Sequence, residues 1–156
     1  MTKNRFVWAA GIISLILDQL SKYWVVQNFR LHESWPLWEG IFHLTYVRNP
    51  GAAFSLFSQD GSWLRWLSLA VSIGLIALAW FGPNFGVWDQ LGYGFILGGA
   101  MGNGIDRFFL NYVVDFLDFR LIHFPVFNLA DMFINVGIAC LFICAFRKQD
   151  PPKSRD

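Results

Sequence analysis

Charged residues are scarce in this chain, and their scarcity excludes an ordinary soluble domain. Only 15% of the 156 residues are Asp, Glu, Lys or Arg, whereas 55% are hydrophobic and 19% are aromatic. A soluble domain carries about 25% charged residues. The formal net charge is only +1 and no stretch of the chain forms a basic stripe, so we expect no nucleic-acid partner. The composition indicates a membrane protein.

Residues that bind metals and cofactors are also few. The two cysteines, Cys140 and Cys144, lie four residues apart in one apolar run, as is typical of small hydrophobic side chains in a helix. The three histidines, His32, His43 and His123, lack the spacing of metal ligands. The sequence has no GxSxG motif, phosphate-binding loop or dinucleotide-binding motif. We therefore expect no metal and no cofactor.

Long hydrophobic runs are abundant, and four of them are long enough to cross a bilayer, which needs about 20 mostly apolar residues per helix. The predicted spans are about 6–27, 63–81, 88–106 and 129–146. Tryptophans lie near their ends, as is typical of the headgroup region. These are Trp8, Trp24, Trp63, Trp66, Trp80 and Trp88. The chain is short enough that we expect one membrane domain over residues 1–156.

The charges that flank the spans predict their orientation. Four spans place both termini on one side, and half of the twelve Lys and Arg residues lie in those short termini. The positive-inside rule makes that side cytoplasmic. The connections 28–62 and 107–128 then face outward. The first span contains Asp18 and Lys22 and lacks a small-residue cleavage site, so we expect it to be retained in the protein.

The first outward connection carries strand patterns. The stretches "IFHLTYV" and "AAFSLF" flank "RNPG", whose Pro-Gly pair predicts a turn. We predict a small extracytoplasmic β-sheet within about residues 28–62 that rests on the membrane surface. The predicted fold class is therefore an all-α membrane protein with four transmembrane helices, a small β-sheet and a surface loop.

Three glycines in the third span, Gly94, Gly98 and Gly102, are spaced by four residues. Such a row of small residues allows the backbone of a neighbouring helix to come close. We interpret the row as a packing feature.

Polar side chains gather at one predicted depth. Asp18 lies about 18 Å along the first helix, at about 1.5 Å per residue, which is in the outer half of the bilayer. The residues that share this depth are Asp18, Lys22, Asn103, Asp106, Arg107, Asp115, Asn128, Asp131 and Asn135. Polar groups inside a membrane are costly and usually face one another or a wet cavity. A functional site near the outer surface is therefore predicted.

Most of these residues also have a structural explanation. Asp18 and Lys22 are i,i+4 partners on one helix face and can neutralise each other. Asn128 fits a helix N-cap, and Asp131 fits the first turn, where the helix dipole favours a carboxylate. This explanation does not cover Asn135, one turn deeper.

For the others, several roles stay open. Asp106 fits a structural partner at a helix end. Arg107 fits either an anchor to lipid headgroups or a cation that holds a substrate carbonyl. Asp115 and Asp118 are equally suitable carboxylates, and their spacing does not choose between them.

Two aspartates brought together at this depth would define one kind of chemistry. Both cannot ionise easily, so one keeps a proton while the other acts as a base. Such a pair can activate water and protonate a leaving amine, and it can thus hydrolyse a peptide without a metal or an activated serine.

Five short motifs resemble those of a known family, the bacterial lipoprotein signal peptidases (signal peptidase II). They are "DQLSK" at 18–22, "NPGAAFS" at 49–55, "GGAMGNGIDR" at 98–107, "VVDF" at 113–116 and "FNLAD" at 127–131, in the order of the family. The resemblance implies an inner-membrane aspartyl endopeptidase with four helices. It implies cleavage of prolipoproteins on the amino side of a diacylglyceryl-modified cysteine.

The resemblance also implies the site. It assigns the catalytic pair to Asp115 and Asp131 rather than Asp118. The residues implied to line or support the substrate site are Asn49, Asn103, Arg107, Asn128, Asp18 and Lys22. The expected partners are lipid-modified prolipoproteins and membrane lipid. We expect a monomer in the bacterial cytoplasmic (inner) membrane, with both termini cytoplasmic and the site near the outer face.

Two other functions fit part of the sequence. A small carrier or proton-conducting bundle would use Asp18, Lys22, Asp106 and Asp131 as a polar relay. Such a relay should continue into the cytoplasmic half, where the predicted spans have no ionisable residue between the flanking charges and the polar layer. A non-catalytic scaffold would use the glycine row, but it leaves the acidic residues unexplained.

Overall fold

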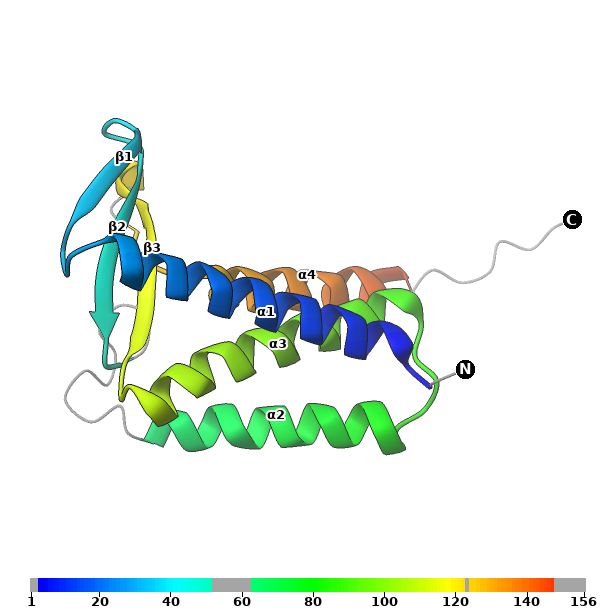
Figure 1. Cartoon of the computed structure of the whole chain (residues 1–156). Coiled ribbons are helices and arrows are strands. Elements are labelled where there is room, and N and C mark those ends of the chain that lie inside the picture. Colours follow the sequence, from blue (N-terminus) through cyan, green and yellow to red (C-terminus); the bar gives the residue numbers. More distant parts are fainter. Residues whose placement is uncertain (1–2, 52–62, 123, 148–156) are drawn as a thin grey trace, which may run out of the picture.

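Four helices run side by side, and a small sheet stands across one end of them (Figure 1). The computed structural model describes residues 3–51, 63–122 and 124–147. The helices are α1 (Arg5–Asn28), α2 (Leu64–Phe81), α3 (Val87–Phe109) and α4 (Leu129–Arg147). The strands are β1 (Ser34–Trp38), β2 (Phe42–Asn49) and β3 (Val113–Phe119), and a 3₁₀ turn, η3 (Arg120–Ile122), follows β3. The start of α1 and the end of α4 lie at the end opposite the sheet (Figure 1).

The predicted glycine row packs α3 against α1. A Cβ atom on Gly94 would lie 2.6 Å from a backbone carbonyl oxygen of α1. A Cβ on Gly98 would overlap the side chain of Ser14, and one on Gly102 would overlap the carboxylate of Asp18. Only glycine allows the two backbones to come this close. The interpretation of the row as a packing feature is therefore confirmed.

A second face of α3 meets α4 in the same way. A Cβ on Gly92 would lie 2.9 Å from the carbonyl oxygen of Gly137, and one on Gly99 would overlap the carbonyl of Ala130. Helix α3 thus lies at the centre of the bundle, between α2 on one side and α1 and α4 on the other (Figure 1). This position brings the polar end of α3 between the two helices that carry Asp18 and Asp131.

The sheet is antiparallel, in the order β1-β2-β3. Its register pairs Asn49 with Val113 and Val47 with Asp115, with an irregularity between Leu44 and Val47. A cluster of buried apolar side chains joins β2 and β3 to the end of α1. The buried members are Val25, Phe29, Tyr46, Val114, Phe116 and Leu117. This cluster fixes the sheet over the end of the bundle where the polar residues gather.

The predicted secondary structure is confirmed in part. All four predicted helices are present, and "IFHLTYV" falls on β2. The predicted strand "AAFSLF", His123 and the basic residues after position 147 lie outside the described residues. The sheet is not confined to about 28–62, because β3 comes from the connection 107–128, the second one predicted to face outward. Strand β3 is buried along almost its whole length, so it lacks the alternating pattern of a half-exposed strand.

Three of the helices are candidate membrane spans by length and apolar composition: Arg5–Asn28, Leu64–Phe81 and Leu129–Phe146. Helix α3 is long enough, but it is not among them. Its many glycines and its charged residues, which include Asp89, Asp106 and Arg107, lower its hydropathy.

Candidate active site

Asp115 lies on β3 and is only 2% exposed. Two side-chain amides donate hydrogen bonds to its carboxylate, Asn49 to Oδ2 at 2.9 Å and Asn128 to Oδ1 at 2.7 Å. Burial raises the pKa of Asp115 to about 7; the hydrogen bond from Asn49 opposes this shift, and the negative charge of Asp131 adds to it. Asp115 can therefore exchange a proton near neutral pH.

Asp131 lies in the first turn of α4 and takes part in the cap of this helix. Its backbone N–H donates to Oδ1 of Asn128 at 3.0 Å, and its own Oδ2 accepts from the N–H of Asn128 at 3.3 Å. This reciprocal pair is a capping box, with Asn and Asp in place of the more usual Ser or Thr and Glu. The N-cap interpretation of Asn128 is confirmed. Because Asn128 also donates to Asp115, the cap of α4 links the two carboxylates.

Asn103 completes the contacts of Asp131. Its Nδ2 atom donates to Oδ1 of Asp131 at 2.8 Å, from the last turns of α3. Both carboxylate oxygens of Asp131 therefore accept an N–H hydrogen bond. Asn135, one turn deeper, donates to the backbone carbonyl of Asp131 at 2.9 Å.

The two aspartates line one open cavity of about 380 Å³. One part of its wall is polar and the rest is apolar. The polar lining residues are Asn49, Asn103, Arg107, Asp115, Asp131 and Asn135. The apolar ones are Val113, Phe124, Pro125, Val126, Phe127 and Ile134. The cavity thus offers two carboxylates to a ligand that is largely apolar.

Arg107 reaches the cavity from α3 through long hydrogen bonds. Its Nη1 atom lies 3.4 Å from the carbonyl oxygen of Asn103 and 3.5 Å from Oγ of Ser68, and Nη2 lies 3.4 Å from the carbonyl oxygen of Gly51. Its Nε atom is buried and has no hydrogen-bond partner among the described residues. A buried donor without a partner is uncommon and costly. Among the described residues, the guanidinium of this cavity-lining arginine thus makes only long hydrogen bonds.

A buried cluster lies behind this wall. The ammonium group of Lys22 lies 2.9 Å from Oδ2 of Asp18, 3.0 Å from Oδ2 of Asp106 and 2.9 Å from Oδ1 of Asn103. The i,i+4 pairing of Asp18 and Lys22 is confirmed, and Asp106 joins it from α3. Gln19, which the sequence analysis missed, donates to both carboxylates at 3.2 Å. Its only sequence signal is its place inside the "DQLSK" motif.

The same cluster holds the two segments that carry the aspartates. Asp18 accepts a hydrogen bond from the backbone N–H of Ala130 at 2.9 Å, at the start of α4. Asp106 accepts one from the N–H of Val114 at 3.0 Å, on β3. The structural role considered for Asp106 is confirmed, because it ties α3 to β3 beside the cavity.

Asp118 lies apart from this site. Residues 115 and 118 are an odd number apart on one strand, so their side chains point to opposite faces of β3. Oδ2 of Asp118 accepts hydrogen bonds from Thr45 at 2.6 Å and from Nε of Arg120 at 2.8 Å. Among the described residues, no group of three or more His, Cys, Asp or Glu side chains could hold a metal ion.

The fold and the site define a membrane protein that presents two linked carboxylates to an open cavity. A family model described as signal peptidase (SPase) II matches residues 10–147. The chain belongs to the signal peptidase II family, which is a family of aspartic peptidases. The resemblance carried by the five motifs is thereby confirmed.

Individual relatives agree with this assignment. The chain is 67% identical over 147 residues to a lipoprotein signal peptidase from Cyanothece sp., which covers 92% of this chain and 85% of the relative. It is 66% identical over 146 residues to one from Nostoc punctiforme, a match that covers 94% of this chain and 92% of the relative. A bacterial membrane enzyme solved by the in meso method at 2.3 Å has the same fold, with a TM-score of 0.87 and 24% identity. The match covers 100% of this chain and 98% of that structure. A second such structure, at 1.9 Å, has a TM-score of 0.82 and 25% identity, and the match covers 97% of this chain and 99% of that structure.

Proposed function

We propose that Asp115 and Asp131 are the catalytic pair of this peptidase. Removal of signal peptides from lipoproteins is the function of its family. We infer that the substrate is a diacylglyceryl-modified prolipoprotein and that the chain cuts it on the amino side of the lipid-bearing cysteine. The observation that carries the assignment is that Asn128 contacts both aspartates at the wall of the 380 Å³ cavity.

The proposed chemistry follows from the environment of Asp115, whose pKa is raised to about 7. In the resting enzyme the pair shares one proton and titrates as a unit, and we assign the role of acid to Asp115 and that of base to Asp131. Asp131 takes a proton from a water molecule that attacks the scissile carbonyl carbon. Asp115 gives its proton to the nitrogen of the leaving amine, and the C–N bond breaks. The products are a carboxylic acid and a free amine.

Arg107 has the geometry of a clamp for the substrate. Arg107 lines the cavity, and its Nη atoms make only long hydrogen bonds, so they can donate instead to a carbonyl oxygen of the substrate. Asn49, Asn103 and Asn128 hold the two carboxylates in place, and Asp18 and Lys22 support them from behind.

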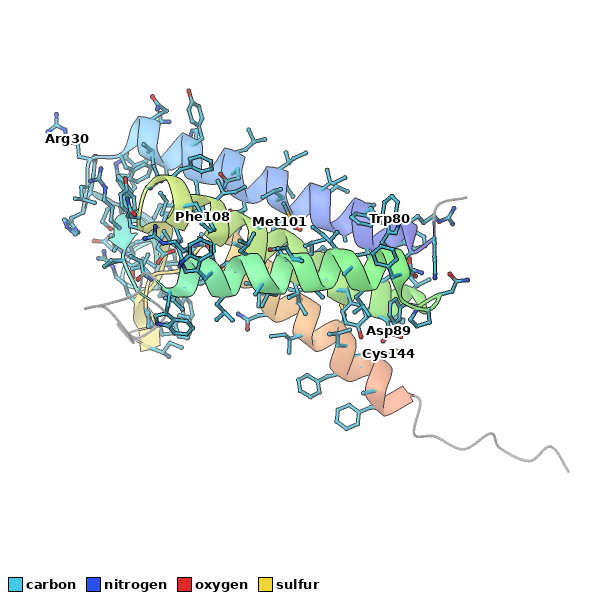
Figure 2. The ribbon with its side chains drawn as sticks, turned by 90° about the horizontal axis from the view of Figure 1, so that it is seen from below. Arg30, Trp80, Asp89, Met101, Phe108 and Cys144 are labelled. Atoms are coloured by element: carbon cyan, nitrogen blue, oxygen red, sulfur yellow. The ribbon has the colours of Figure 1, made fainter. Side chains whose placement is uncertain are left out.

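The site suits a substrate that is anchored in lipid. Large apolar side chains are exposed along α1, α2 and α4. Figure 2 shows the bundle from the side of α2, with Arg30 and Phe108 toward the sheet and Trp80 and Cys144 toward the other end. In our proposal all four helices cross the bacterial inner membrane, and α3 does so between the other three. Both termini are cytoplasmic, and the cavity lies near the outer face. The chain acts as one domain and as a monomer, without a cofactor.

The proposal is tested with purified protein in detergent and a diacylglyceryl-modified prolipoprotein, with a chelator present and absent. We expect Asp115→Asn and Asp131→Asn to remain folded in thermal unfolding and to lose cleavage by about 10²- to 10⁴-fold. Asp118→Asn is the matched control, because it changes the same strand on its other face. Mass spectrometry of the products identifies the bond that is cut. If the Asp115 or Asp131 variant cleaves at the wild-type rate, the proposed catalytic pair is wrong.

A further inference from the structure

We infer that Lys22 is a positioning residue for Asp131 and that it acts through the side-chain amide of Asn103. The inference rests on the proposed function of Asp131. Lys22 does not line the cavity as the described residues define it. Its charge lowers the pKa of Asp115 through space, and any effect of its contacts on the chemistry passes through its neighbours.

The orientation of the Asn103 amide follows from its partners. A lysine ammonium has three donors and no acceptor, so Asn103 must turn its oxygen toward Lys22, at 2.9 Å. The same oxygen accepts a second hydrogen bond from Nδ2 of Asn128 at 3.0 Å. The Asn103 NH₂ group is left to face Oδ1 of Asp131, at 2.8 Å. A rotation of the Asn103 amide by half a turn would turn its NH₂ group toward the donors of Lys22 and Asn128. It would also turn its oxygen toward the carboxylate of Asp131.

Lys22 cannot relax away from this contact. Its other two protons are directed at Asp18 and Asp106, and its side chain is only 4% exposed. Asn103 is 5% exposed. Because both side chains are buried, water cannot readily replace a lost hydrogen bond between Lys22 and Asn103. A buried amide without its partner is costly.

Asn103 in turn holds one of the two oxygens of Asp131, and the backbone N–H of Asn128 holds the other. The direction in which Asp131 faces the cavity thus depends on an amide that Lys22 orients. Without Lys22, one of the two donors that set the amide is lost, and Asp131 loses its fixed orientation. We expect this loss to lower kcat while KM stays unchanged, because the residues that line the cavity remain.

The test compares neutral replacements of Lys22 in a background that lacks the charge of Asp18, one of its two ion-pair partners. A lone Lys22→Met change would leave two buried carboxylates without a cation, so each variant also carries Asp18→Asn, which removes one of these charges. Met and Gln have similar length, but only Gln can donate to Asn103. We expect Asp18→Asn/Lys22→Met to have a kcat about 10- to 100-fold below that of Asp18→Asn alone, and Asp18→Asn/Lys22→Gln to recover a large part of the loss.

The path through Asn103 is tested by a double-mutant cycle. In an Asn103→Ala background, exchange of Lys22 for Met should not lower kcat further. The inference is overturned if the Met and Gln variants have the same kcat as Asp18→Asn, or if Met lowers kcat equally with and without Asn103. An active Asp131→Asn variant would instead overturn the proposed function. An inactive Asp131→Asn variant beside a fully active Met variant would overturn the inference about Lys22 alone.

Discussion

The side-chain amide of Asn128 donates a hydrogen bond to Oδ1 of Asp115 at 2.7 Å. Asn128 is also the residue that caps α4, through its contacts with Asp131. One side chain therefore ends a strand-to-helix connection and holds two carboxylates at the wall of the cavity. The structural and the proposed catalytic role of this position rest on different atoms, so substitutions can separate them.

We predict that Asn128→Ser keeps the helix cap but loses cleavage. Serine is a good N-cap residue, whereas alanine is not, so Asn128→Ala should unfold with a free energy about 1 kcal/mol lower than Asn128→Ser. Neither serine nor alanine has a side-chain amide that could donate to Asp115. Both variants should therefore lose most of kcat. Chemical unfolding in detergent micelles and a cleavage assay measure the two effects. A Ser variant with wild-type kcat would contradict the role of the Asn128 amide.

We predict that kcat/KM falls as the pH rises above about 7. The proposed acid, Asp115, must carry its proton, and burial raises its pKa to about 7. Above that value the protonated fraction, and with it the rate, should fall about tenfold per pH unit. Asp118→Asn is the control and should show the same profile. A rate that stays constant through this range would exclude Asp115 as the acid.

The raised pKa of Asp115 also predicts a pH-dependent stability. Between pH 3.8 and about pH 7, Asp115 keeps its proton in the folded state but has lost it in the unfolded state. The stabilisation is therefore complete below 3.8 and is lost as the pH rises through about 7. Its size is on the order of 4 kcal/mol. Thermal unfolding of wild type and Asp115→Asn at several pH values measures it, because the variant should lack this slope. Parallel slopes for the two proteins would contradict the prediction.

We predict that Arg107→Ala lowers cleavage by about 100-fold, because the substrate loses a positioned donor. Arg107→Lys should recover only part of the activity, since lysine is a point charge without the fixed fork of the guanidinium. Initial rates over a range of substrate concentrations measure both variants. Normal cleavage by Arg107→Ala would remove the clamp from the mechanism.

Glycine substitutions should separate the packed faces of α3 from open positions. Gly98→Ala places a methyl group on Ser14 of α1, and we expect a loss of about 1 to 3 kcal/mol in the free energy of unfolding. Gly74→Ala on α2 is the matched control, because a Cβ there meets nothing within 4 Å. It should leave stability unchanged or raise it by about 0.4 to 1 kcal/mol. Equal stability of the two variants would contradict the close packing of α1 and α3.

The sequence by itself determined the helices, the membrane class and the family. The length of an apolar run and the spacing of its polar residues are local properties, so the four helices could be predicted within a few residues. The gathering of Asp18, Asn103 and Asp131 at one depth also followed, because helix rise converts residue number into distance. The capping role of Asn128 could be predicted because it depends on neighbours a few residues away.

The tertiary structure decided the contacts between distant segments. Residue spacing alone did not distinguish Asp115 from Asp118; the face of β3 that meets the cavity depends on its pairing with β2 and on the irregularity between Leu44 and Val47. Strand β3 is buried and lacks an alternating pattern, so its place in the sheet was not predicted. The contact from Lys22 to Asn103 joins residues 81 positions apart. Such contacts depend on how α3 packs between α1 and α4, because its glycines let both backbones approach.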